Sequence, residues 1–269
     1  MLFRSAGAVQ PITVACFGIA GPVVGDRVKT PNLPWLIDGR EVARVLHLKS
    51  VALINDLEAT AYGALTLEAN EFFTLNAGAA EPRAAIGLIA AGTGLGEATL
   101  HWNRNGYRAL ASEAGHADFA ARTELEIELL AYLIRRFGRV SYERVISGPG
   151  ILNIYNFLRD SGRFTEPASL KERLLSGDPA AVISQAALAN EAEICIKTLD
   201  LFVSAYGAEA GNLALRAKAL GGIYVGGGIA PKIIAKLAEG EFMRAFADKG
   251  RYGEFVARVP VKVDRKSVV

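Results

Sequence analysis

The sequence has little of what marks several specialised protein classes. Its 269 residues include only two cysteines and three histidines. Two cysteines are too few for a small scaffold held together by disulfides. Because Cys16 and Cys195 both stand among apolar neighbours, we expect buried free thiols rather than a disulfide or a metal-binding pair.

An excess of one charge and a long apolar run are also missing. The chain has 30 basic and 28 acidic residues, and the net charge of +2 gives no electrostatic basis for binding nucleic acid or an anionic membrane. No apolar run reaches the roughly 18 residues that a membrane span needs. Residues 1–10 also lack the apolar core of a signal peptide. We therefore expect neither a nucleic-acid partner nor a membrane partner, and the two free thiols suit a protein of the reducing cytoplasm.

What is present is typical of an α/β protein. Hydrophobic residues make up 51% of the chain and charged residues 22%, which is the composition of a globular protein. Runs of β-branched residues alternate with segments of helical spacing. We expect strands at 12–19, 50–54, 71–75, 86–90, 222–225 and 259–263, and helices at 37–46 with Asp38 as the cap, 57–67, 124–137 and, as one long run, from 178 to about 207.

A glycine-rich turn follows the apolar run at 86–90. Gly92, Thr93 and Gly94 leave backbone N–H groups that can face one point, and glycine lets the backbone approach a phosphate closely. Many strand turns are rich in glycine for steric reasons alone, so this turn has two interpretations. A second turn, Gly226 to Gly228, stands between a strand and a helix and suits an anion or a nucleoside. It lacks the spacing of a Rossmann fingerprint, which argues against a dinucleotide site.

Polar side chains that suit a polyol occur at three further places. Asn55 and Asp56 end a predicted buried strand, where Asp56 can accept a proton from an alcohol, although it can equally cap the next helix. Glu113 and His116 can bind neighbouring hydroxyls or make a simple surface contact, and no third residue completes a zinc site with them. Glu143 precedes a Gly-Pro-Gly turn and, taken alone, is typical of a solvated helix residue.

Six motifs in register resemble the bacterial glucokinase family of the actin/hexokinase ATPase superfamily. The resemblance extends from Val14 to about Asp264. The motifs are FGIAGPV at 17–23, INDLEAT at 54–60, AGTGLG at 91–96, EAGHADF at 113–119, YERVISGPG at 142–150 and GGIYVGGGIAP at 221–231.

This resemblance implies a two-domain actin-like ATPase fold, which is ribonuclease H-like, and transfer of the ATP γ-phosphoryl group to the 6-hydroxyl of glucose with Mg²⁺ as cofactor. It also suggests a homodimer. Carried over by position, Asp56 is the general base, and Asn55, Glu113, His116 and Glu143 bind the sugar. Gly92, Thr93 and Gly94 then form a phosphate turn, and Gly226, Gly227 and Gly228 line the adenosine pocket.

The sequence departs from the family pattern at both ends. The family begins with a strand that carries an Asp-x-Gly-Gly-Thr phosphate turn and closes with a helix, and this sequence has neither. We therefore expect a truncated chain, with an incomplete small domain at 1–66 and a large domain at 67–269. We also expect weak glucose binding and little turnover, because a preorganised phosphate cradle stabilises the transition state by several kcal/mol.

Two other functions stay open at this point. The chain could phosphorylate another hexose, since the sugar-binding side chains fit glucose without proving it. It could also be a non-catalytic sugar-binding or regulatory module of the same fold, although an aspartate at position 56 argues against that. A cysteine-rich zinc motif and a helix-turn-helix segment are both missing from the sequence, which argues against a sugar-responsive repressor.

Overall fold

The structure, a computed structural model, describes residues 11–30 and 33–266. Its contacts divide the chain into two units, Met1–Tyr62 and Gly63–Val269. The sequence placed the corresponding boundary after residue 66.

The first unit contains two small sheets. Strand β1 (Val14–Ile19) pairs in parallel with β5 (Ser50–Asn55), and β2 (Val23–Val24), β3 (Arg27–Lys29) and β4 (Leu36–Asp38) form an antiparallel sheet. Helix α1 (Gly39–Val45) begins where Asp38 Oδ1 accepts a hydrogen bond from the Arg40 backbone N–H at 2.9 Å. The predicted cap is therefore confirmed, because a short acidic side chain satisfies an N–H group that the helix itself leaves free. Helix α2 (Asp56–Ala64) follows β5 and crosses into the second unit.

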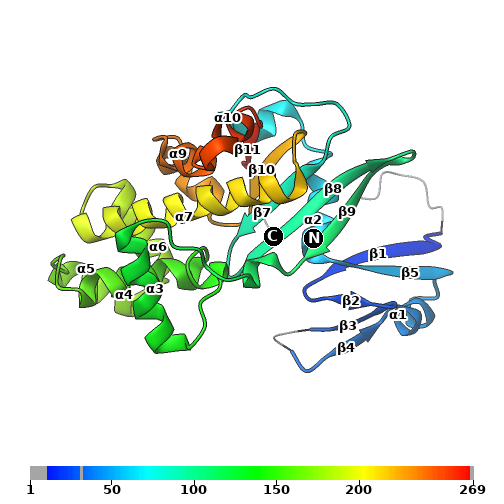
Figure 1. Cartoon of the computed structure of the whole chain (residues 1–269). Helices are drawn as coiled ribbons and strands as arrows, with labels where there is room; N and C mark the ends of the chain where they lie inside the picture. Colours follow the sequence, from blue (N-terminus) through cyan, green and yellow to red (C-terminus); the bar gives the residue numbers. More distant parts are fainter. Residues whose placement is uncertain (1–10, 31–32, 267–269) are drawn as a thin grey trace. The chain divides into compact units, whose positions relative to one another are not determined.

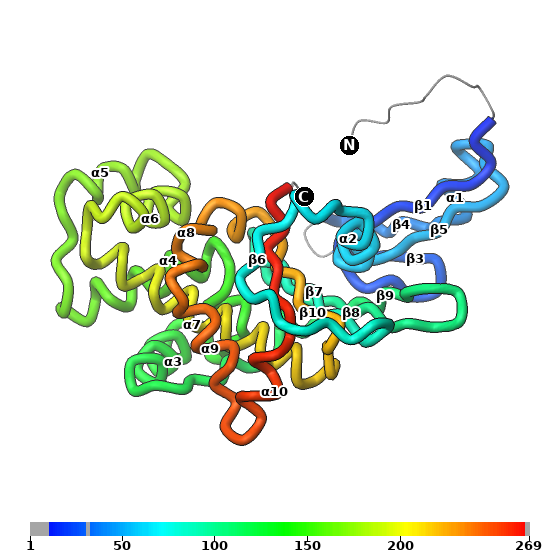
Figure 2. The backbone as a smooth tube through the Cα atoms, turned by 90° about the horizontal axis from the view of Figure 1, so that it is seen from above, coloured from blue at the N-terminus to red at the C-terminus, as the bar shows by residue number. Residues whose placement is uncertain are grey.

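The second unit is built on a six-stranded mixed sheet (Figure 1). The strand order is β6-β11-β10-β7-β8-β9, in which β11, β10 and β7 are parallel and the other pairs are antiparallel. Figure 2 shows β6 and β11 side by side, although they come from opposite ends of this unit. The bounds are β6 (Phe72–Asn76), β7 (Ile86–Ala91), β8 (Leu95–Asn103), β9 (Gly106–Ser112), β10 (Gly222–Gly226) and β11 (Val261–Asp264).

Helix α7 (Glu193–Ala217) is the central helix of this unit, and Figure 1 shows it running along the sheet. Its side chains Phe202 and Tyr206 are fully buried and continue into an aromatic row with Phe242 and Phe246 of α9. The remaining elements are α3 (Glu124–Phe137), α4 (Gly148–Asp160), α5 (Ala168–Ser176), α6 (Pro179–Leu188), α8 (Ile234–Leu237), α9 (Glu241–Ala247), α10 (Gly253–Ala257) and the short 3-10 turns η1 (Ala69–Glu71), η2 (Ala114–His116), η3 (Tyr142–Arg144), η4 (Ala230–Ile233) and η5 (Gly250–Tyr252).

Two predictions about local structure are wrong. The long helix expected from 178 to about 207 is two helices, α6 and α7, because the chain turns at Asn190, whose φ is 54°. Asparagine tolerates this left-handed conformation better than most residues, so the break needs no glycine or proline. Strand β9 and helices α5, α9 and α10 are among the elements that the sequence did not predict. Cys16 is exposed on β1, whereas Cys195 is buried as expected.

Among the described residues, none of the helices combines the length and the apolar character that crossing a membrane requires.

Candidate active site

The glycine turn that joins β7 to β8 is fixed by backbone hydrogen bonds. The Gly92 N–H donates to the Gly94 carbonyl at 2.9 Å, which closes the turn. The Gly92 carbonyl accepts from the Gly148 N–H at 2.8 Å, which ties the turn to the start of α4. Thr93 is exposed at the tip. The turn is therefore held in one shape while its tip stays open to a ligand.

The second glycine turn lies against the first. Gly227 has a φ of 82°, and a Cβ at this position would lie 2.3 Å from the Ala91 carbonyl oxygen, so only glycine fits. The Ile229 N–H donates to the same carbonyl at 3.2 Å. A Cβ on Gly92 would meet the Gly228 nitrogen at 4.0 Å, which shows how closely the two turns approach. Two motifs that the sequence presented separately thus form one glycine-lined surface.

A tyrosine hydroxyl joins the two strands beneath these turns. Tyr206 Oη is 3.3 Å from the backbone nitrogen of Ala91 at the end of β7 and 3.3 Å from the carbonyl oxygens of Ile89 and Gly226. The hydroxyl can accept from the Ala91 N–H while it donates to one carbonyl at a time. Burial raises the pKa of Tyr206 well above its ordinary value, so the proton needed for this donation stays on the oxygen. Sequence reasoning missed Tyr206, because it looks like any other core residue of an apolar helix.

Glu143 connects the first glycine turn to His116. Its Oε2 accepts a hydrogen bond from the Leu95 N–H at 3.0 Å, directly after the turn. Its Oε1 lies 4.0 Å from Nδ1 of His116. The Glu143 side chain is 32% exposed, so the expectation of a solvated helix residue is wrong. The carboxylate instead lies half-buried between the first glycine turn and His116, both of which are far from Glu143 in the sequence.

The loop that carries Glu113 and His116 is held by its own short 3-10 turn and by an arginine. The His116 N–H donates to the Glu113 carbonyl at 3.0 Å. Arg139 Nη2 donates to the His116 carbonyl at 2.6 Å and lies 2.7 Å from Oδ1 of Asp118. Both predicted side chains are exposed. The spacing of three residues suggested that His116 pairs with Glu113. In the structure His116 lies beside Glu143 instead.

The structure assigns the cap of α2 to Asn55. Asn55 Oδ1 accepts from the Leu57 N–H at 2.8 Å, and Asn55 Nδ2 donates to the Gly21 carbonyl at 3.2 Å. Asp56 follows as the first residue of α2, is partly exposed, and its Oδ1 also accepts from Leu57 at 3.0 Å. Because Asn55 already accepts from the Leu57 N–H, Asp56 is not required for that capping hydrogen bond.

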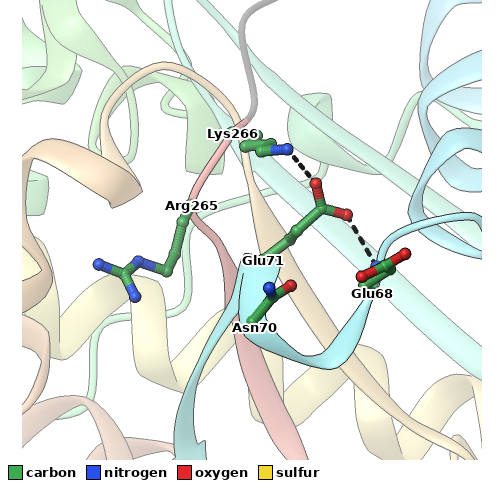
Figure 3. Close-up of a pocket in the computed structure, with 5 residues that line it drawn as sticks. All are labelled: Glu68, Asn70, Glu71, Arg265 and Lys266. Atoms are coloured by element: carbon green, nitrogen blue, oxygen red, sulfur yellow. Dashed lines mark hydrogen bonds and ion pairs between the residues drawn. The ribbon is translucent and has the colours of Figure 1, made fainter.

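No group of three or more metal-binding side chains occurs among residues 11–30 and 33–266. A hollow of the second unit lies apart from the predicted residues, where β6 begins and β11 ends (Figure 3). It is lined by Glu68, Asn70, Glu71, Arg265 and Lys266, and an ion pair between Lys266 and Glu71 crosses it. None of the predicted site residues lines this hollow.

Known glucokinases match nearly the whole chain. A family model described as Glucokinase matches residues 2–267. The chain belongs to the glucokinase family. A glucokinase from Nostoc sp. is 43% identical over 262 residues, which cover 93% of this chain and 77% of that protein. A glucokinase from Synechocystis sp. is 44% identical over 270 residues, with coverages of 94% and 76%.

Solved glucokinase structures share the fold. The crystal structure of a glucokinase from an Antarctic psychrotroph has 35% identity and a TM-score of 0.79, and the match covers 92% of this chain and 74% of that one. Together with the family match, this makes the chain an ATP-dependent hexose kinase with the actin-like ATPase fold. The expectation of a chain truncated at both ends is not borne out by these matches.

Proposed function

We propose that Glu143, His116 and Glu113 bind the hydroxyls of glucose, and that Asp56 is the general base for phosphorylation of the 6-hydroxyl. The observation that carries this proposal is the position of Glu143. Its carboxylate is fixed to the glycine turn at Leu95 and lies 4.0 Å from His116. A side chain held in this way brings a sugar-binding group next to a phosphate-binding turn, as phosphoryl transfer to a sugar requires.

The chemistry of the sugar site follows from its donors and acceptors. An ionised carboxylate accepts hydrogen bonds from hydroxyls, and an imidazole can donate one and accept another. Glu143 Oε1 faces His116, and Oε2 is occupied by the Leu95 N–H. Neighbouring hydroxyls of a pyranose can therefore bridge Oε1 and the imidazole. Arg139 supports this arrangement, because it fixes the backbone of His116.

The two glycine turns are the proposed binding surface for ATP. Residues Gly92, Thr93 and Gly94 offer backbone N–H groups and a hydroxyl to the phosphates, and Gly226, Gly227 and Gly228 line the adenosine side. The close approach of Gly92 and Gly228 supports one continuous surface. Mg²⁺ would enter the site bound to the phosphates of ATP, since this ion keeps several waters and needs few protein carboxylates.

In the proposed mechanism Asp56 takes the proton of the sugar hydroxyl as that oxygen attacks the γ-phosphorus. The bond from the γ-phosphorus to the bridging oxygen breaks, ADP leaves, and Asn55 stands beside Asp56 to orient the sugar. Little covalent chemistry is left for the protein, so positioning and charge account for most of the rate. We place this reaction in the cytoplasm. A homodimer, which the resemblance suggests, stays a prediction that sedimentation analysis would test.

Thermal unfolding with and without sugar tests the proposed site, because a ligand that binds the folded state raises the midpoint. We expect glucose to raise the midpoint of the parent chain. Glu143→Gln should weaken glucose binding by about tenfold or more, since hydrogen bonds to a charged group contribute about 1.5–3 kcal/mol. The matched control is Glu128→Gln on the exposed side of α3, where the carboxylate pairs with Arg163 at 2.8 Å. Equal losses in the two variants would refute the role of Glu143.

A phosphate-transfer assay with a panel of hexoses tests the reaction. We expect glucose to be the preferred acceptor and turnover to be slow, because the sequence has no Asp-x-Gly-Gly-Thr phosphate turn. A kcat on the order of 10–100 s⁻¹ would overturn the expectation of low activity. Preference for mannose or N-acetylmannosamine would replace glucose as the substrate. Sugar-dependent stabilisation with no transfer at all would indicate a sugar-binding module instead of a kinase.

A further inference from the structure

Two glutamates of the second unit share one arginine in the interior. Glu97 on β8 and Glu209 on α7 are both fully buried. Arg216 lies 3.2 Å from Glu97 Oε2 and forms an ion pair with Glu209 Oε1. The Arg216 side chain is 47% exposed, so it reaches from the surface into the pair. One guanidinium therefore faces two carboxylates.

The hydrogen bonds of this pair are incomplete if both carboxyl groups are ionised. Glu97 Oε1 is the one buried side-chain polar atom in the described part of the chain that has no hydrogen-bond partner. A buried acceptor without a partner is costly, and two like charges at close range disfavour each other. A proton on Glu97 removes one negative charge and turns the unpartnered oxygen into a donor that can reach Glu209.

The charged and titratable groups around the pair come from several elements. Tyr142 of η3 and Tyr206 of α7 face it, and Lys249 approaches from the segment after α9. Burial lowers the pKa of Lys249, and the charges of Arg122 and Arg216 lower it further. The charges of Asp248 and Glu209 oppose this and raise it. These groups do not supply a second compensating charge next to Glu97.

A chain of contacts leads from this pair to the sugar site. Asn212 Nδ2 donates to Glu209 Oε2 at 2.9 Å and to the Tyr142 hydroxyl at 3.0 Å. Tyr142 is buried, and its backbone N–H donates to the Ala117 carbonyl at 2.9 Å. The next residue in the chain is Glu143. The side chains of Asn212 and Tyr142 therefore connect Glu209 to the residue that precedes Glu143.

A second route runs along β9. Ser112 Oγ donates to the backbone carbonyl of Glu97 at 3.0 Å, and Ser112 directly precedes Glu113. Glu113 follows Ser112 in the chain, and Glu143 follows Tyr142. Each acidic residue of the proposed sugar site is therefore next to a residue that is hydrogen-bonded, directly or through Asn212, to this pair.

We propose that Glu97 and Glu209 are positioning residues that share one proton at neutral pH, and that this shared proton holds Tyr142, and with it Glu143, in the sugar-binding arrangement. The effect on sugar binding rests on the function proposed above, whereas the shared proton does not. Loss of the proton leaves two buried negative charges, which separate and displace Tyr142. Glucose affinity then falls as the pair ionises.

The direction of the pKa agrees with this geometry. Burial, and then the charge of Glu209, raises the pKa of Glu97 from 4.5 to about 8, against the opposing effect of Arg216. The folded chain thus keeps a proton that the unfolded chain releases above about 4.5. Stability from this group is complete below the unfolded value and decreases as the pH rises to about 8, where it levels off.

The first experiment tests the proton without sugar. Glu97→Gln replaces the protonated acid by a neutral side chain of the same shape. We expect infrared spectra of the parent at pH 7 to show a protonated carboxyl band that the variant lacks. Relative to the variant, the unfolding equilibrium constant of the parent should rise about tenfold per pH unit between about pH 5 and 8.

The matched control for this experiment is Glu126→Gln. Glu126 is equally buried, but its carboxylate is fully paired with the backbone and side chain of Arg122, at 2.6 and 3.0 Å. We expect this variant to lose stability at pH 7 without losing the protonated band. A parent without the band, or a Glu97→Gln chain that fails to fold at pH 7, would overturn the proposal.

The second experiment tests the connection to sugar binding. We expect the glucose dissociation constant of the parent to increase several-fold between pH 7 and pH 9, and that of Glu97→Gln to stay flat. Tyr142→Phe removes the hydroxyl that receives the contact and should weaken glucose binding at pH 7, with a loss of stability no larger than that of one buried hydroxyl. A pH-independent dissociation constant in the parent would refute the positioning role. If Glu143→Gln leaves glucose binding unchanged while the protonated band is present, the proposed sugar site fails and the shared proton stands.

Discussion

The two units of the chain hold their proposed site residues in different ways. In the second unit, the glycine turns and Glu143 are bound to several elements above a continuous core. In the described part of the first unit, the buried apolar side chains are Val28, Ala43, Leu53 and Ala61. On and beside β1, Ile12, Val14 and Phe17 are 75%, 58% and 36% exposed.

This difference predicts separate roles for the two units: substrate binding in the second unit and proton transfer in the first. The proposed phosphate and sugar groups of the second unit are preorganised, which lowers the entropy lost when substrates bind. The proposed base, Asp56, follows a strand that has only one partner in the part of the chain that the structure describes. We therefore expect substitutions in the second unit to change affinity, and substitutions in the first to change the rate.

The largest expected effect is that of Asp56→Asn. This change keeps the shape of the side chain and removes the proton acceptor, so kcat should fall by about 10²–10⁴ with little change in glucose affinity. A radiolabelled phosphate-transfer assay, which detects slow turnover, measures it. Reduced stability with unchanged kcat would restore the helix cap as the role of Asp56.

Hydrogen exchange compares the two sheets directly. Amides of β7 and β10 lie in the middle of a covered sheet, whereas those of β1 and β5 belong to a two-stranded one. Elements with few buried contacts open more easily, so we expect exchange in β1 and β5 to be faster by at least about a hundredfold. Equal protection in the two sheets would show that the first unit is as stable as the second.

A pair of alanine substitutions separates the functions of the first glycine turn. A Cβ on Gly94 would lie 2.6 Å from Glu143 Oε2, so Gly94→Ala must push that carboxylate from the Leu95 N–H. We expect about a tenfold loss of glucose affinity, in line with the loss of one hydrogen bond to a charged group. The matched control is Gly92→Ala, whose Cβ has only a 4.0 Å contact with Gly228 and should raise the KM for ATP instead. Identical effects on both substrates would contradict this division.

The smallest expected effect is that of Tyr206→Phe. The change removes one buried hydroxyl that bridges β7 and β10, and should cost about 1–2 kcal/mol of unfolding free energy. Denaturant unfolding measures this cost. A change in the KM for ATP without a change in stability would mean that the hydroxyl serves the nucleotide rather than the sheet.

The features that the sequence predicted well depend on neighbouring residues. The Asp38 cap and the bounds of α3 follow from residues within one or two turns of helix. Both glycine turns were also recognisable from their own composition. The six motifs identified the family, although each was weak alone.

The features that were missed depend on residues far apart in the chain. The bond from Leu95 to Glu143 and the shared arginine of Glu97 and Glu209 join segments that no local pattern connects. The break at Asn190 was missed for a different reason, because neither glycine nor proline marks it. The pairing of His116 with Glu143 needed the fold of η2 and η3 against each other.

The hydroxyl of Tyr206 also offers a spectroscopic probe. It touches the ends of β7 and β10, the two strands that carry the glycine turns, and it is closed to water. Fluorotyrosine at this position would place a fluorine atom on the ring beneath both turns. The fluorine resonance should shift when a nucleotide binds to the turns. Tyr206→Phe would show which of the eight tyrosine resonances of the chain belongs to Tyr206.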